Sequence, residues 1–218
     1  MSSMDVRSHS VHHWCDNLWM RSDAGPLVSR EFLSAYISGY ADGEGCFTIS
    51  IAPRATLAVG WEVRPSFSVS QNGDRAEVLH VIQAHCGCGS IRPDRSDKTL
   101  KWETRKLDEL VGRVIPHFIR YPLLSAKRRD FERFAFVCRL MADGEHRSRV
   151  GLIKIVSIVR EMNPGGRRRY NADELLATLL KGEGIVCASG NGGETRSSDL
   201  HEWRNDLGAV STRDPVKL

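Results

Sequence analysis

The segment that begins near residue 29 has the hydrophobic spacing of an amphipathic helix. Phe32, Tyr36 and Tyr40 recur four residues apart, with Leu33 and Ile37 beside them. This spacing predicts one bulky apolar face at the period of an α-helix. We therefore expect a helix over about 30–43 with one bulky apolar face.

A second face of the same helix carries small residues. Ala35, Gly39 and Gly43 also recur four apart, and small side chains allow two helix backbones to approach closely. Glycine inside a helix costs about 1 kcal/mol relative to alanine, so Gly39 is expected to have a packing role. Ser29 precedes the helix as a suitable N-cap. The pattern predicts that a second helix packs against the small face.

Apolar and polar residues then alternate at the period of β-strands. The alternation is clear over residues 46–51 and 61–71, and shorter runs lie around residue 91 and over 98–104. Pro65 cannot donate to a ladder, so its strand is predicted to be an edge there or to carry a bulge. The sequence predicts two pairs of strands.

Helical patterns separate and follow these strand pairs. Asp74 and Glu77 have the spacing of a capping box that opens a helix to about residue 85, and apolar spacing predicts another helix over 107–118. The element order is helix, two strands, helix, two strands, helix. We predict an α+β fold with an αββαββα core, in which helices cover one face of an antiparallel sheet and leave the other face polar.

Three more helices are predicted after this core. Ser125 and Ser148 are placed to cap the first two, and the third begins at Asn171. The flanking segments lack periodicity, and the C-terminal one is rich in Gly, Ser and Asn. The expected organisation is a poorly ordered extension over 1–28, one domain over 29–181 and a flexible tail over 182–218.

Two acids lie where the first helix meets the first strand. Asp42 and Glu44 are separated by glycine, close to the helix C-terminus, whose partial negative charge disfavours carboxylates. Mg²⁺ is usually held by one or two carboxylates together with waters and substrate phosphates, which matches these ligands. The alternative is that both acids are solvated in a glycine-rich turn; the helix before and the strand after favour a cation site.

Composition limits the class of protein. The chain has 218 residues and a formal net charge of +4, enough for one sizeable domain. It shows no apolar run long enough to span a bilayer and no apolar leader after Met1, so we expect an intracellular protein without a membrane partner, acting in the cytoplasm, at the nucleoid or in an organelle.

The cysteines suggest a weaker alternative. Cys86 and Cys88 form the one close pair and follow His85, but no second pair of ligands is suitably placed, with His12 and His13 as distant candidates. Buried thiols in a reducing compartment are therefore favoured over a zinc site.

Basic and hydroxyl side chains occupy the predicted free face of the sheet. Such a mixture can contact base edges and phosphates in a major groove, although an ordinary solvated face would also be polar, and composition leaves both interpretations open. A basic cluster that opens the helix after residue 125 adds a candidate phosphate contact. The candidate DNA-contacting residues are Arg64, Ser66, Ser68, Ser70, Arg92, Lys98, Lys101 and Lys127.

The segment from Tyr36 to Phe47 resembles the LAGLIDADG motif of homing endonucleases. Further segments resemble the same family in the same order, and the likeness covers roughly residues 32–180. The resemblance implies a saddle-shaped antiparallel sheet that lies in the major groove, with motif helices paired at a two-fold axis. These further segments are 67–71, 115–118, 121–123 and 145–163.

The resemblance also implies a catalytic centre. Glu44 stands where the family binds its catalytic divalent metal, Mg²⁺ or another such as Mn²⁺, and the carbonyl of Gly43 commonly joins the coordination. The commonest form of the motif has Asp at the position of Glu44, and the family contains members with Asp and members with Glu there. Asp42 resembles a structural acid rather than a ligand.

Other roles carried by the resemblance lie outside the motif. Gln71 stands where the family places a residue that orients the attacking water, and Arg75 matches a basic position near the scissile phosphate. Arg105 lies near the family's catalytic lysine by spacing, with Lys106 as the adjacent alternative. From the residues alone, Gln71 and Arg75 are an ordinary strand end and first helical turn.

One motif in the chain implies that a complete site needs two chains. The predicted dimer interface consists of Ala35, Gly39, Asp42 and Gly43. The favoured hypothesis is a homodimeric, metal-dependent endonuclease that hydrolyses both strands of a long pseudo-palindromic DNA target, as intron homing requires. The alternative is a nucleic-acid-binding protein of the same fold that does not cleave, such as a maturase that binds its own intron RNA or a decayed endonuclease.

Overall fold

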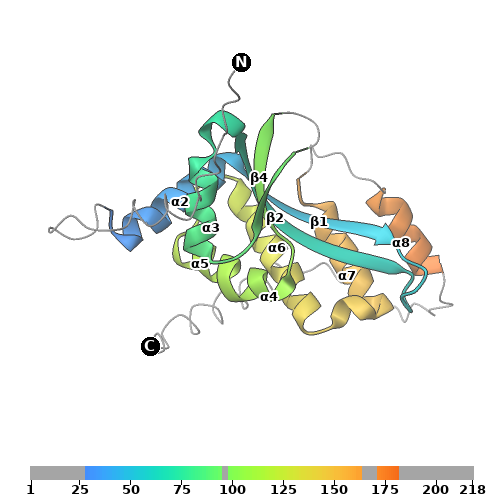
Figure 1. The fold of residues 1–218 in the computed structure, drawn as a ribbon. Helices are drawn as coiled ribbons and strands as arrows, with labels where there is room; N and C mark the ends of the chain where they lie inside the picture. The colour runs from blue at the N-terminus through green and yellow to red at the C-terminus, as the bar shows by residue number, and fades with distance from the viewer. Residues whose placement is uncertain (1–27, 95–97, 164–170, 182–218) are drawn as a thin grey trace, which may run out of the picture.

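A computed structural model describes residues 28–94, 98–163 and 171–181 (Figure 1). The predicted extension, except for Val28, and the predicted tail lie outside these ranges. The described elements are α2 (Arg30–Glu44), β1 (Gly45–Pro53), β2 (Trp61–Asn72), η1 (Gly73–Arg75), α3 (Glu77–Cys86), β3 (Ser90–Pro93), β4 (Thr99–Thr104), α4 (Leu107–Glu109), η2 (Leu110–Val114), α5 (Ile115–Arg120), α6 (Lys127–Ala142), η3 (Glu145–Arg147), α7 (Arg149–Arg160) and α8 (Ala172–Lys181).

The four strands form one antiparallel sheet in the order β1-β2-β4-β3. The predicted α+β class and the αββαββα order are confirmed. Pro65 pairs with Ile49 of β1, whereas the pairing of β2 with β4 begins only at Phe67. On its β4 side Pro65 is therefore at an edge, as its missing N–H requires.

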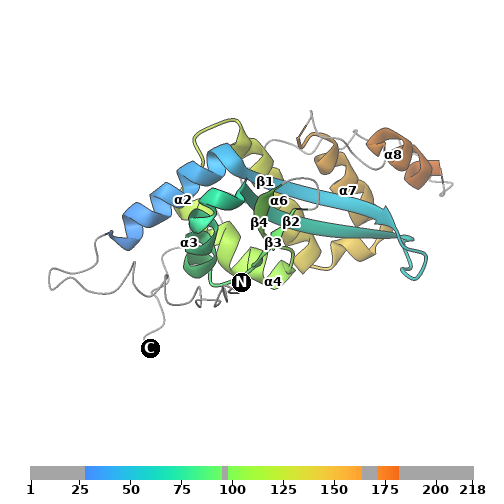
Figure 2. The ribbon, with the colours of Figure 1, turned by 45° about the horizontal axis from the view of Figure 1, so that its top comes forward.

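The helices cover one face of this sheet. Phe47, Phe67 and Trp102 point toward them and are almost fully buried, and the rings of Phe47 and Phe67 stack with centroids 4.5 Å apart. Phe131 and Phe134 of α6 pack on Phe47. Figures 1 and 2 show α6 and α7 beneath the strands and α2 running outward from the end of the sheet where β1 begins. Alternate strand residues turn to the opposite, polar face.

The predicted bulky face of α2 is divided between the core and the surface. Leu33, Ile37 and Ala41 are buried, but Phe32 is 65% exposed and Tyr36 is 48% exposed. Residues four apart on a helix differ by about 40° in direction. Both rows of apolar residues therefore satisfy the helical period, and only the position of the sheet and of α3 decides which row is covered.

The helix starts were partly predicted. Ser29 accepts a hydrogen bond from Phe32 N at 3.1 Å, and Ser148 accepts one from Gly151 N at 3.0 Å, so both predicted N-caps are confirmed. The capping box at Asp74 is wrong: residues 73–75 form a separate 3₁₀ turn, and α3 begins after Ala76 without a side-chain cap. Ser125 accepts from Lys127 N at 3.1 Å, one residue ahead of the α6 N-cap.

The helix predicted over 107–118 is interrupted by a π-helical turn, η2. Pro116 follows this turn and has no N–H to donate to the carbonyl four residues earlier, and wider π-type turns accommodate such a break. Helical backbone then continues to Arg120. Among the described residues, no helix is both long and apolar enough to cross a bilayer.

Candidate active site at the end of α2

Asp42 is held within its own chain. Its carboxylate accepts hydrogen bonds from Leu124 N at 3.0 Å, Ser125 N at 2.9 Å and Ser125 Oγ at 2.5 Å. Partial burial opposes ionisation, but these hydrogen bonds and the nearby charge of Lys127 outweigh it and hold the pKa of Asp42 below its usual value. The carboxylate therefore ties the end of α2 to the turn that leads into α6.

Lys127 lies at the same helix end. Its Nζ donates to the carbonyl oxygens of Gly43 at 2.9 Å and Ala41 at 3.2 Å. An ammonium group there is favoured, because the last carbonyls of a helix carry partial negative charge. Lys127 was predicted to contact DNA, and the structure places its charge on the carbonyls that precede Asp42 and Glu44.

Gln71 of β2 contacts Tyr40, which lies one helical turn before Glu44 in α2. The Tyr40 hydroxyl accepts a hydrogen bond from Gln71 Nε2, and Gln71 Oε1 accepts from Asn72 N at 2.7 Å. Burial raises the pKa of Tyr40, and the negative charge of Glu44 raises it further against the opposing hydrogen bond from Gln71. Glu44 itself is exposed. Through Tyr40, Gln71 is linked to the turn of α2 that ends in Glu44, and its role in orienting water stays a prediction.

The donors at this end suit a hard divalent cation. Glu44 offers an exposed carboxylate and Gly43 a backbone carbonyl, which are oxygen ligands of the kind that Mg²⁺ and Mn²⁺ take. Within the described ranges, no group of three or more His, Cys, Asp or Glu side chains could enclose a metal. One chain therefore supplies part of a coordination shell, and water, phosphate or a second chain must complete it.

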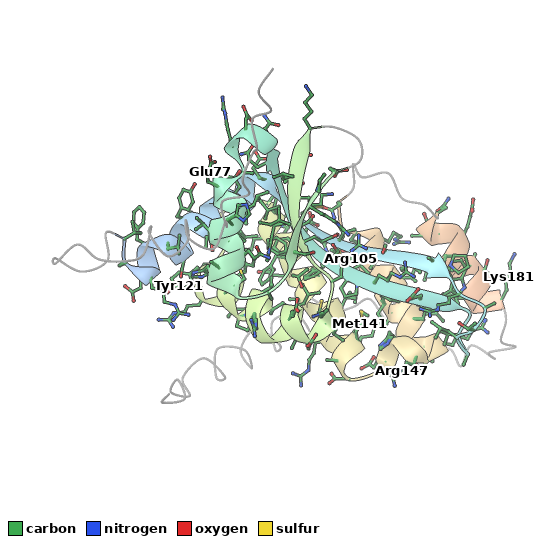
Figure 3. All side chains as sticks on the ribbon, in the orientation of Figure 1. Glu77, Arg105, Tyr121, Met141, Arg147 and Lys181 are labelled. Atoms are coloured by element: carbon green, nitrogen blue, oxygen red, sulfur yellow. The ribbon has the colours of Figure 1, made fainter. Side chains whose placement is uncertain are left out.

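Arg105 is not part of this centre. In the register of β2 and β4, Gln71 pairs with Leu100, so Arg105 lies five residues further along, about 16 Å away at the usual strand rise. Its Nε donates to Glu103 at 3.0 Å, and Lys106 pairs with Glu109 at 2.9 Å. Figure 3 labels Arg105 beyond the end of β4. The basic side chain that the fold brings to the helix end is Lys127 instead.

Sequence spacing could not predict that Lys127, and not Arg105, lies at the end of α2. Lys127 reaches the site from α6, more than 80 residues after the motif. The signal available in the sequence was its position two residues after Ser125, the serine that binds Asp42. Arg75 ends η1 directly after β2 and is exposed, and its position near the scissile phosphate stays a prediction.

The polar sheet face mixes the predicted cations with acids. Arg64 pairs with Glu62, and Lys101 pairs with Asp94 at 3.1 Å. Ser66 and Ser70 are partly exposed, whereas Ser68 is buried, and Lys98 is exposed just before β4. The face carries less free positive charge than its arginines and lysines suggested.

The zinc alternative is not supported. Burial raises the pKa of the Cys86 thiol to about 12 and also raises the pKa of Cys88. Zinc binds thiolates, which these surroundings disfavour. His85 instead contacts His117 of α5, with 3.3 Å between Nε2 and Nδ1. His12 and His13 lie outside the described residues.

Residues 37–138 match the family model of the LAGLIDADG endonuclease. The crystal structure of the homing endonuclease I-TnaI is 31% identical in sequence, with a TM-score of 0.60 over 71% of this chain and 97% of that chain. This chain belongs to the LAGLIDADG endonuclease family.

Two further relatives of this LAGLIDADG chain differ in length. The archaeal intron-encoded homing endonuclease I-Vdi141I, solved in complex with DNA, is 28% identical with a TM-score of 0.65 over 70% of this chain and 98% of that chain. A probable intron-encoded endonuclease of Neurospora crassa is 28% identical over 132 residues, which is 60% of this chain but only 29% of the fungal protein. The chain thus spans less than a third of that relative's length.

Proposed function

We propose that this chain is a site-specific DNA endonuclease of the homing type, active as a homodimer with Mg²⁺ or Mn²⁺. One observation carries the proposal. The end of α2, where Glu44 lies, is contacted by Gln71 through Tyr40 and by Lys127 through the Gly43 carbonyl, beside the polar face of the sheet. A carboxylate for a metal, an amide and a fixed ammonium are the groups that phosphodiester hydrolysis needs around one phosphate.

The open face of α2 supports the homodimer. Ala35, Gly39 and Gly43 are exposed, and a Cβ built on either glycine would meet nothing within 4 Å. Phe32 and Tyr36 are exposed beside them. A second α2 related by a two-fold axis would cover these apolar groups and bring two copies of Glu44 close together, one for each DNA strand.

The residues divide the chemistry between them. Glu44 and the Gly43 carbonyl would hold the divalent ion, which supplies an activated water and stabilises the charge of the leaving oxygen. The amide of Gln71, fixed by Tyr40, orients a water molecule near Glu44. The ammonium of Lys127 stabilises negative charge that develops on the phosphate, and Asp42 holds the helix end in place.

The polar face of the sheet is the proposed DNA-binding surface, with exposed Arg64 and Lys98 and partly exposed Lys101 among its contacts. I-Vdi141I, of similar fold, was solved with DNA. Because the proposed substrate is genomic DNA, we place the activity inside the cell.

Cleavage of DNA that carries an uninterrupted copy of the host gene tests the proposal. With Mg²⁺, the wild-type protein should linearise this DNA, and Glu44→Gln should bind it but cut about 10³-fold more slowly, because metal stabilisation of the transition state is worth several kcal/mol. Glu31→Gln, the same change in the first turn of α2, should cut like the wild type.

Two outcomes would overturn the proposal. Equal cutting by wild type and Glu44→Gln would remove Glu44 from the centre. Specific binding by the wild type without any metal-dependent cutting, or binding only to the intron RNA, would instead make the chain a nucleic-acid-binding protein that does not cleave.

A further inference from the structure

A buried carboxylate lies in the middle of the polar sheet face. Glu103 of β4 is only 8% exposed, and its cross-strand partners are Ser68 and Ser90. Its Oε1 accepts from Ser66 Oγ at 2.6 Å and from Arg105 Nε at 3.0 Å. Its Oε2 pairs with Nη2 of Arg92. Arg92 of β3 and Arg105, which directly follows β4, therefore converge on one acid.

An acid at this place is unfavourable unless it has a role. A buried carboxylate loses its hydration, and on a surface that faces phosphates it also repels the ligand. The three donors around Glu103 compensate the lost hydration. The repulsion remains, so Glu103 lowers general affinity for DNA.

The arginines gain orientation from this contact. Their side chains are still 49% exposed at Arg92 and 59% exposed at Arg105. A guanidinium has five N–H groups in a rigid fork, so one edge can bind Glu103 while other N–H groups point outward. An arginine fixed in this way presents the donor pair that matches O6 and N7 of guanine in the major groove.

We infer that Glu103 is a positioning residue, which holds Arg92 and Arg105 as readers of guanine at neighbouring base pairs instead of as contacts to phosphate. This inference rests on the proposed binding of DNA by the sheet. Phosphate contacts raise affinity without regard to sequence, whereas fixed base contacts discriminate between sequences. Glu103 thus lowers the affinity for DNA of any sequence and raises discrimination between base sequences.

Selection from a randomised duplex library tests the inference, with the full chain and without divalent metal so that binding is measured alone. The wild type should recover guanine at defined positions of each half-site. Glu103→Gln should lose preference at these positions only. It should also bind a mixed-sequence duplex more tightly, with a salt slope steeper by about 1 to 2, because each released arginine that neutralises a phosphate adds about 0.9.

Two controls separate positioning from charge and from folding. Asp143→Asn makes the same change of net charge at an exposed pair with Arg139 on α6, and should leave base preference unchanged. Arg92→Lys and Arg105→Lys keep the charge and are exposed, so they should fold, but they lose the planar fork and should lose guanine at the same positions as Glu103→Gln.

The outcomes are distinct. Unchanged base preference in Glu103→Gln, or in both lysine variants should Glu103→Gln fail to fold, would overturn the inference while DNA binding stands. A wild-type protein that neither binds nor selects any duplex would instead overturn the proposed function.

Discussion

At the scale of the residue, three charged groups within a short distance have three different tasks because their partners differ. Asp42 is surrounded by donors from residues 124 and 125, Glu44 is exposed, and Lys127 donates to two backbone carbonyls. A carboxylate that already accepts three hydrogen bonds has little capacity for a cation, whereas an exposed one keeps it. The partners therefore favour Glu44 over Asp42 as the metal ligand.

Replacing Lys127 tests its assigned task. We expect Lys127→Met to lower the single-turnover cleavage rate about 10²- to 10³-fold, which is typical for the loss of one fixed donor at a developing charge. The affinity for target DNA should change by less than about tenfold. Arg128→Met, the neighbouring residue that pairs with Glu132, is the control and should cut normally. A loss confined to affinity would make Lys127 a phosphate contact only.

At the scale of the element, α2 has two faces with different partners. Leu33, Ile37 and Ala41 belong to the core of the chain, and Phe32 and Tyr36 flank the open row of small residues. In a monomer, Phe32 and Tyr36 would leave apolar surface in water beside this row. This face is therefore expected to be covered in the active protein.

Enlarging Gly39 should separate folding from assembly. Gly39→Leu adds a side chain where nothing lies within 4 Å, so the single chain should fold and gain up to about 1 kcal/mol of helix propensity. The leucine should block the approach of a second α2 and abolish the dimer in analytical ultracentrifugation. Gly112→Leu, which also points into open space, is the control for added apolar surface. A Gly39→Leu protein that remains dimeric would contradict this interface.

At the scale of the whole molecule, a partly buried chain of hydrogen bonds joins α2, α3 and α5. The Ser38 hydroxyl donates its one hydrogen to Tyr121 O at 2.7 Å, so it must accept from His117 Nε2 at 3.1 Å. His117 Nδ1 then lacks a proton and accepts from His85 Nε2, 3.3 Å away. This order requires His117 to be neutral, because its Nδ1 must keep a lone pair to accept the hydrogen bond. Burial accordingly lowers the pKa of His117 to about 4 and also lowers the pKa of His85.

Stability should therefore fall in mild acid. Because the folded pKa of His117 lies below the value of about 6.5 for an unfolded histidine, the unfolded state binds more protons at low pH. The stabilisation is complete above pH 6.5 and is lost as the pH falls toward 4, by up to about 3 kcal/mol from His117. Urea unfolding at pH 7.5, 6 and 5 measures this loss. The His117→Gln variant should be less stable than the wild type, and its free energy of unfolding should depend less on pH. An equal pH dependence of stability in wild type and His117→Gln would contradict the assignment of this loss to His117.

Much of the fold could be predicted because strand alternation, helix capping and the missing N–H of proline depend only on residues that are close in sequence. Alternation placed Phe47 and Phe67 toward the core, Ser29 and Ser148 were recognised as caps, and Pro65 was recognised as an edge residue. The motif residues Glu44 and Gln71 were found through resemblance. The apolar pattern of α2 left the exposed face undecided because it has two equivalent solutions, and the error at Arg105 arose where spacing replaced a known register.

The sequence by itself determined the elements, their order and the acidic end of α2, because these depend on periodicity, capping and backbone chemistry within a few residues. Only the tertiary structure decided which face of α2 is open, that Lys127 lies on Gly43, and that Glu103 gathers Arg92 and Arg105. These contacts join residues far apart in the chain, and the packing of α6 and the register of the strands bring them together.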